Sequence, residues 1–157
     1  MALPLTLLVA SCSAIPTPEA PPPQSVAPAP APAPAPMPAP SGSWEERALN
    51  NGAWRFDAGS RTAAFVPTGS ASPLLSLTCS GGSIRMTSGL AGDVSLRTSA
   101  GIDQIRFEGG GASLPARDPR LDRIAFSRGR FALESPGGGG LTLPVQSEIG
   151  RVIEDCR

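Results

Sequence analysis

The stretch LLSLTCSGGSIRMTS, residues 74–88, alternates apolar and polar side chains on both sides of a Ser-Gly-Gly turn. The apolar positions are Leu75, Leu77, Cys79, Ile84 and Met86. Alternation with a period of two is typical of strands that have one buried face, and paired glycines favour a tight turn. Residues 74–79 and 83–88 are therefore predicted to form a β-hairpin.

Similar alternation recurs through most of residues 44–157, in short segments separated by Gly-rich turns. These segments are marked by Trp54 and Phe56, residues 62–66, Val94 to Thr98, Ile105 and Phe107, Phe131 and Leu133, and Leu141 and Leu143. One internal helix is expected after Asp118, an N-cap followed by Pro119, with Gly129 ending the turn. The pattern predicts a mostly β (α+β) domain, a small antiparallel β-sandwich or barrel with a C-terminal helix packed on the sheet.

The last segment has helical periodicity and carries a cysteine. Ser147 is the expected N-cap, and Ile149, Val152, Ile153 and Cys156 follow at spacings i, i+3, i+4 and i+7. Cys156 thus lies on the apolar helix face, as Cys79 lies on the apolar face of its strand. Both thiols point into one core, which predicts a disulfide, and two separate buried thiols are the alternative.

The third cysteine, Cys12, follows a short apolar run at residues 2–10 that is far too short to span a bilayer. Val9-Ala10-Ser11-Cys12 resembles the bacterial lipobox, which implies a signal peptide at 1–11, lipidation of Cys12 and cleavage after Ser11. An ordinary cleaved signal with a chance cysteine is the alternative. Ser13 at the next position implies the outer membrane under the sorting rule of Gram-negative lipoproteins. No Lys or Arg precedes Cys12, so we expect the true start to lie upstream.

Residues 12–43 consist mostly of Ala, Pro and Ser. Proline fixes φ and has no N–H, so we expect neither helix nor sheet there but a disordered, extended tether. A passive low-complexity linker and a spacer that holds the domain away from the membrane are both consistent with this composition.

The composition argues against most catalytic chemistry. The chain has no His and no Tyr, all its basic residues are Arg, and the formal net charge is zero. Without His or Lys there is no imidazole ligand, Ser-His-Asp triad or Schiff-base lysine, so neither enzyme activity, metal nor cofactor is expected. Asp118 with Asp122 and Glu154 with Asp155 are better explained as a helix cap and a solvated helix face, with Arg151 placed to pair with Asp155. The chain has no excess of basic residues that would indicate binding to nucleic acid.

One group of side chains is a candidate binding site. Arg85, Arg97 and Arg106 each occupy the polar register of a predicted strand. If these strands are adjacent, the guanidinium groups form a row on one sheet face, which could bind phosphate or carboxylate groups of lipopolysaccharide or peptidoglycan. An ordinary solvated face is the alternative.

The C-terminal third, DPRLDRIAFSRGRFALES followed by LTLPVQSEIGRVIEDCR, resembles an uncharacterised group of short lipoproteins and exported proteins of sphingomonad-type alphaproteobacteria. The likeness covers roughly residues 50–157 and implies a cell-envelope location but no activity. We therefore expect a non-catalytic envelope lipoprotein that faces the periplasm, bound to the membrane through its lipid and to envelope components or another envelope protein through its domain. The alternative is a periplasmic inhibitor resembling the small β-barrel inhibitors of secreted proteases.

Overall fold

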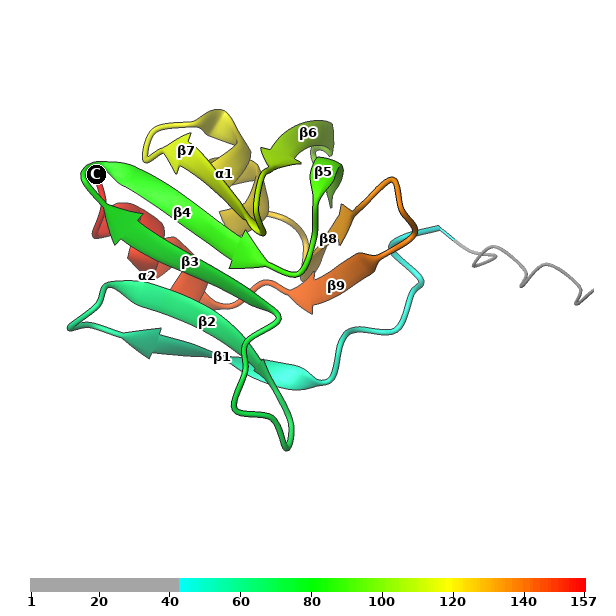
Figure 1. Cartoon of the computed structure of the whole chain (residues 1–157), viewed down its shortest axis with the longest axis horizontal. Helices are drawn as coiled ribbons and strands as arrows, with labels where there is room; N and C mark the ends of the chain where they lie inside the picture. Colours follow the sequence, from blue (N-terminus) through cyan, green and yellow to red (C-terminus); the bar gives the residue numbers. More distant parts are fainter. Residues whose placement is uncertain (1–42) are drawn as a thin grey trace, which may run out of the picture. The chain divides into compact units, whose positions relative to one another are not determined.

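The computed structural model describes residues 43–157; the predicted signal peptide, Cys12 and the tether up to residue 42 lie outside this range. The described chain forms two antiparallel sheets and two short helices (Figure 1). The first sheet has the order β1 (Gly52–Asp57), β2 (Thr62–Pro67), β3 (Leu75–Ser80), β4 (Ser83–Ser88) and β7 (Gly111–Pro115). The second has the order β6 (Gly101–Phe107), β5 (Gly92–Thr98), β8 (Arg130–Glu134) and β9 (Gly140–Pro144). The helices are α1 (Pro119–Ala125) and α2 (Ser147–Glu154).

The predicted fold class is confirmed, and of its two forms the sandwich-like one is observed. The strands form two separate sheets and no closed barrel within the described residues. The chain leaves the first sheet after β4, forms β5 and β6 in the second, and returns for β7. In most strands the side chains at alternate positions are buried, so the apolar alternation of the sequence corresponds to the core. Strand β8 differs, because it buries the three consecutive residues Phe131 to Leu133.

The hairpin of residues 74–88 is also confirmed. Strands β3 and β4 pair with Leu77 opposite Met86 and Ser80 opposite Ser83. The two turn residues have positive φ, +56° at Gly81 and +74° at Gly82. Two consecutive left-handed residues define the turn whose twist matches that of the flanking strands, and glycine adopts this conformation without steric cost.

Some boundaries differ from the sequence predictions. The Asp118 cap of α1 is confirmed by a 2.9 Å hydrogen bond from the Arg120 N–H to its carboxylate, but α1 ends at Ala125, well before Gly129. Ser147 was expected to cap α2, whereas it is the first helical residue and Gln146 holds the cap position without a side-chain bond. The strand β7 was not predicted, because a five-residue segment beginning with glycine has a weak strand signal.

Helix α2 packs on the inner face of the first sheet, where it contacts β1, β2 and β3. Its buried residues are Ile149, Val152 and Ile153. A disulfide joins Cys156, just beyond the helix, to Cys79 in the middle strand, with the Cα atoms 5.4 Å apart and a sequence separation of 77. The predicted bridge is therefore present, and it holds the end of the chain against the sheet.

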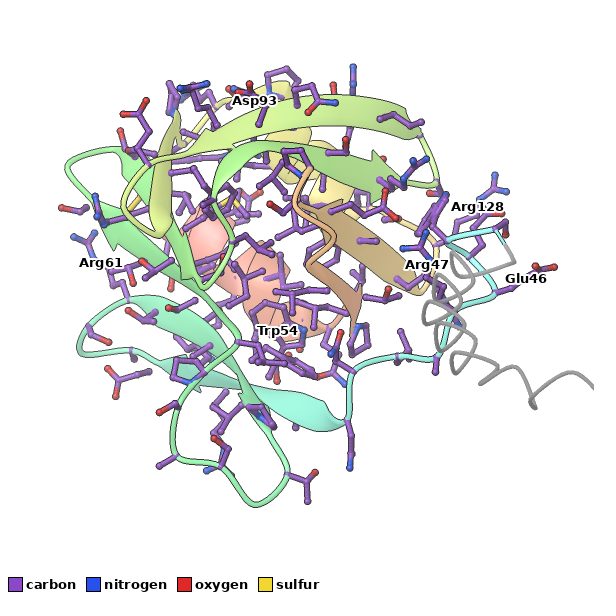
Figure 2. All side chains as sticks on the ribbon, turned by 45° about the vertical axis from the view of Figure 1, so that its right-hand side comes forward. Glu46, Arg47, Trp54, Arg61, Asp93 and Arg128 are labelled. Carbon is purple, nitrogen blue, oxygen red and sulfur yellow. A yellow bond between two sulfur atoms is a disulfide. The ribbon has the colours of Figure 1, made fainter. Side chains whose placement is uncertain are left out.

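Trp54 connects the two sheets (Figure 2). Its indole Nε1–H donates a 2.8 Å hydrogen bond to the carbonyl of Pro144 at the end of β9. Its ring contacts that of Phe65 edge to face, with 5.6 Å between the centroids. One buried side chain thus adds apolar contact within the first sheet and a polar bond to the second.

The segment that precedes β1 is bonded along the edge strand of the second sheet. The Asn50 N–H donates to the Thr142 carbonyl at 2.8 Å, and the Thr142 N–H donates to Asn50 Oδ1 at 2.7 Å. Upstream, the Arg130 guanidinium donates to the Arg47 carbonyl at 2.7 Å. We call residues 43–51 the strap; it satisfies part of the otherwise open edge of β9.

Removing the disulfide should strongly destabilise the domain. Because the bridge closes a long loop, Cys79→Ala with Cys156→Ala is expected to lower the free energy of unfolding by about 4–5 kcal/mol in the chain-entropy model. Denaturant titration with and without reductant measures this loss. A Cys12→Ala variant should retain the full response to reductant, and an unfolding midpoint that does not change on reduction would contradict the assignment.

Candidate functional site

The three arginines predicted to form a row, Arg85, Arg97 and Arg106, lie in two different sheets. Arg85 is in β4 of the first sheet, whereas Arg97 and Arg106 are in β5 and β6 of the second. Within the β5–β6 pair, Arg97 lies opposite Ile102 and Arg106 lies opposite Asp93, at the other end of the strands. The prediction of a continuous row is therefore wrong, because the chain passes from the first sheet to the second between β4 and β5.

Arg106 is paired with carboxylates on its own sheet. Its Nε donates to Glu108 at 2.9 Å and its Nη1 to Asp93 at 3.0 Å. The hydrogen bond with Glu108, followed by the one with Asp93, raises the pKa of the guanidinium. Two carboxylates already face this cation, so it is poorly suited to recruit another anion.

Arg97 is paired as well, in a cluster that includes the strap. Glu134 of β8 accepts from Arg97 on one carboxylate oxygen and from Arg47 on the other. Burial raises the pKa of Glu134, but the hydrogen bonds from Arg97 and Arg47 more than offset this, so its pKa is lowered overall. The cluster joins the strap to the outer face of the second sheet and has a structural role.

The outer face of the first sheet, opposite the core, has a different composition. Its side chains are half-buried or exposed, whereas α2 and the core cover the inner face. We call this surface the hydroxyl face, because most of its central positions are Ser or Thr. Its defining residues are Thr62, Ser76, Thr78, Arg85, Thr87 and Ser113.

Strand pairing arranges these residues in rows across the sheet. In one row Thr62 lies beside Thr78, then come Arg85 and Ser113, on four successive strands. The hydroxyls of Thr62 and Thr78 are 2.9 Å apart and hydrogen-bonded. In the next row Ser76 lies beside Thr87, and paired strands place such side chains about 5 Å apart.

Arg85 lies across the hydroxyl face toward β7. A Cβ atom added to Gly111 would be 3.0 Å from Arg85 Nη2 and 3.4 Å from Cζ. The absence of a side chain at Gly111 therefore leaves the space in which the guanidinium rests on the sheet. Arg85 makes no ion pair with any described carboxylate, unlike Arg97 and Arg106 of the second sheet.

A second cation, Arg55 of β1, lies on the same outer face. It is in register with Ala64, which pairs with Ser76, so the hydroxyl-bearing strands lie between Arg55 and Arg85. Three strand spacings of about 4.8 Å separate β1 from β4, or roughly 14 Å. Asp57, the acidic residue at this edge, accepts hydrogen bonds from the Ser60 N–H and hydroxyl, which lower its pKa.

This arrangement is suited to binding a flat anionic ligand. Ser76, Thr87 and Ser113 make no side-chain hydrogen bond to another described residue, so their hydroxyls are available to donate or accept. A guanidinium without a protein partner can bond to phosphate or carboxylate in two parallel hydrogen bonds. Hydroxyls flanked by two cations thus match a polymer that carries both sugar hydroxyls and negative charges.

Part of the hydroxyl face could be predicted from the sequence. The polar positions of β3 and β4, including Thr78 and Arg85, are visible in the alternation of residues 74–88. Ser113 was missed because β7 was missed, and the role of Gly111 depends on a pairing between β4 and β7 that no local pattern reports.

Within residues 43–157, no three potential ligands among His, Cys, Asp and Glu lie close enough together to hold a metal ion. No helix in the described part of the chain is long and apolar enough to cross a membrane. Comparisons with family models, with curated proteins and with solved structures gave no match.

The cluster at Glu134 makes stability depend on pH. The carboxyl of Glu134 has a lower pKa in the folded chain than its ordinary value of 4.5. The ionised carboxylate therefore stabilises the fold above that pH, and this stabilisation is lost as the pH falls through the folded-state pKa. At pH 7, Glu134→Gln should lower the free energy of unfolding by about 1–2 kcal/mol. Urea titration from pH 7 to pH 3 should show the gap between mutant and wild type closing.

The exposed pair of Arg106 and Glu108 supplies the control for this measurement. Glu108→Gln should have a much smaller effect, because solvent screens that pair. A gap for Glu134→Gln that stays constant down to pH 3 would contradict the assigned role of the cluster.

Proposed function

We propose that the protein is a lipid-anchored, non-catalytic binding module of the bacterial cell envelope. The lipobox-like residues Val9 to Cys12 support the anchor, and Ser13 supports an outer-membrane location facing the periplasm. The Cys79–Cys156 disulfide supports export, because such bonds persist in oxidising compartments. The resemblance of the C-terminal third to exported lipoproteins supports the same location.

The ligand that fits the hydroxyl face best is an anionic sugar polymer of the envelope. The observation that carries this proposal is Arg85, a guanidinium held over Gly111 among hydroxyls, without a described carboxylate partner. Peptidoglycan supplies carboxylates and lipopolysaccharide supplies phosphates, and both display sugar hydroxyls. Fixed, partner-free cations contribute more to anion binding than cations that must first break an ion pair.

The alternative, a periplasmic inhibitor of the β-barrel type, has less support. The strands form two open sheets, so the expected barrel is absent from the described residues. The N-terminal segment that such an inhibitor would insert into a protease lies outside the described residues.

Binding by the hydroxyl face can be tested by co-sedimentation with purified peptidoglycan sacculi and, separately, with lipopolysaccharide. Arg85→Gln should weaken binding about tenfold in whichever arm is positive, because one charge-assisted hydrogen-bonded contact is lost. Gly111→Ala should weaken it too, because the new methyl group displaces the guanidinium while only a flexible side chain must move.

The matched control is Arg106→Gln, which removes the same charge from the other sheet and should leave binding unchanged. Binding should also fall as salt is raised from 50 mM to 500 mM, because exposed charges are screened. If neither polymer binds, or if Arg106→Gln weakens binding as much as Arg85→Gln, the hydroxyl face is not the site.

The anchor requires its own test. Mass spectrometry of the exported protein should find a mature N-terminus at Cys12 that carries acyl chains, and palmitate labelling should be lost in Cys12→Ala. That variant should move from the membrane to the soluble fraction, because stable anchoring requires the acyl chains. Unchanged mass and fractionation in the mutant would overturn the anchoring proposal.

A further inference from the structure

The register of the first sheet places five positions of its outer face in one row that crosses every strand. The row begins on the edge strand β1 and ends on the opposite edge strand β7. Its members, each paired with the next, are Arg55, Ala64, Ser76, Thr87 and Gly111. Side chains of paired residues stand beside each other on one face, about 5 Å apart. We call this row the lane.

Small side chains form the floor of the lane. Ala64 carries only a methyl group, Ser76 and Thr87 carry short hydroxyl side chains, and Gly111 has no side chain at all. Between the first and last positions there is no charged residue and no side chain larger than threonine. An extended ligand can therefore lie close to the sheet along the whole lane and form hydrogen bonds with the hydroxyls.

A guanidinium lies at each end of the lane. At the β7 end, the side chain of Arg85 reaches over Gly111 from the neighbouring row, so that a Cβ atom there would be 3.0 Å from Nη2. At the β1 end, Arg55 is exposed and makes no ion pair with a described carboxylate. Four strand spacings of about 4.8 Å separate β1 from β7, so the ends of the lane are roughly 19 Å apart.

A ligand that followed one strand would meet a less favourable surface. Along β1, Asp57 is the next residue on the same face as Arg55, so an anion there would also face a carboxylate. Along β4, the next outer residue after Arg85 is Thr87, and no second cation follows within the strand. Among the described residues of this face, the direction across the strands joins two cations without passing a carboxylate.

We propose that a glycan strand crosses the hydroxyl face along the lane, and that Arg55 and Arg85 bind carboxylates from different repeats of that strand. This inference rests on the proposed function and adds the direction of the ligand, the spacing of its charges and a second anchoring residue. The spacing exceeds the length of one sugar ring, so a single anionic sugar reaches only one cation. Peptidoglycan fits because it repeats its carboxylates along an extended strand, whereas lipopolysaccharide carries its phosphates near its lipid end.

The length of the ligand should therefore decide the affinity. Once one carboxylate is bound, the second contact forms within the complex at a high effective concentration. This gain requires a ligand long enough to reach both arginines, and it disappears when either arginine is removed. Affinity should rise with fragment length until the fragment spans the lane and should then level off.

Isothermal titration calorimetry with soluble peptidoglycan fragments of one to four disaccharide repeats tests this inference. The parent protein is the mature chain from residue 12 with Cys12→Ala, which keeps it in solution. It should bind the longest fragments at least tenfold more tightly than the shortest. Arg55→Gln should remove this dependence on length, whereas Arg85→Gln should weaken the binding of fragments of every length.

The matched control is Arg61→Gln, which removes an exposed arginine from the turn between β1 and β2, outside the lane. Arg55 and Arg61 are both exposed, so neither change should unfold the domain, and Arg61→Gln should keep the full dependence on length. Moving the cation gives a second test. Arg55→Gln combined with Ala64→Arg places a guanidinium one strand closer to Gly111, so the affinity should level off at a shorter fragment.

Different results would contradict the proposed function and this inference. If no fragment binds, or if Arg85→Gln changes the affinity for none of them, the hydroxyl face is not the site and both fail. If binding requires Arg85 but the parent shows no dependence on length, or Arg55→Gln retains it, the proposed function stands and the inference is overturned. Equally tight binding of deacylated lipopolysaccharide that requires both arginines would overturn the assignment to peptidoglycan.

Discussion

The covalent link between Cys79 and Cys156 decides which surfaces of the domain are free. It attaches the end of the chain to the middle strand of the first sheet, so α2 is held on the inner face of that sheet. Because one face is covered in this way, the opposite face is left to solvent with its Ser, Thr and Arg side chains. The exposure of the hydroxyl face thus depends on how this bond places α2.

Arginine is the only basic residue type in the chain. The arginines Arg97 and Arg106 of the second sheet differ from Arg85 of the first in their partners. On the second sheet, Arg97 and Arg106 each have a carboxylate on a neighbouring strand. On the first, Arg85 lies among hydroxyls with a glycine beneath its guanidinium. A cation that is already paired has little to gain from an external anion, whereas one held without a partner does. Pairing within the sheet, more than the number of charges, therefore distinguishes the outer face of the second sheet from the face that we propose to bind a ligand.

Local patterns in the sequence predict much of the fold. The hairpin of residues 74–88 was predictable because its alternation and its Gly81-Gly82 turn are contiguous. The Cys79–Cys156 bridge was predictable because each cysteine has a clear place in a strand or helix register. The assignment of strands to sheets was not, since a three-residue link after β4 does not reveal whether β5 joins the same sheet. That one long-range choice removed the expected row of Arg85, Arg97 and Arg106.

The strap has a mechanical consequence. A pull transmitted through residue 43 acts first on the Arg47–Glu134 contact and then on the paired bonds between Asn50 and Thr142. All of these lie on the second sheet, whereas the hydroxyl face lies on the first. Unfolding under force is governed by the unfolding rate rather than by equilibrium stability. Tension applied at residue 43 is therefore expected to detach the strap from β9 before it reaches β1 and the hydroxyl face.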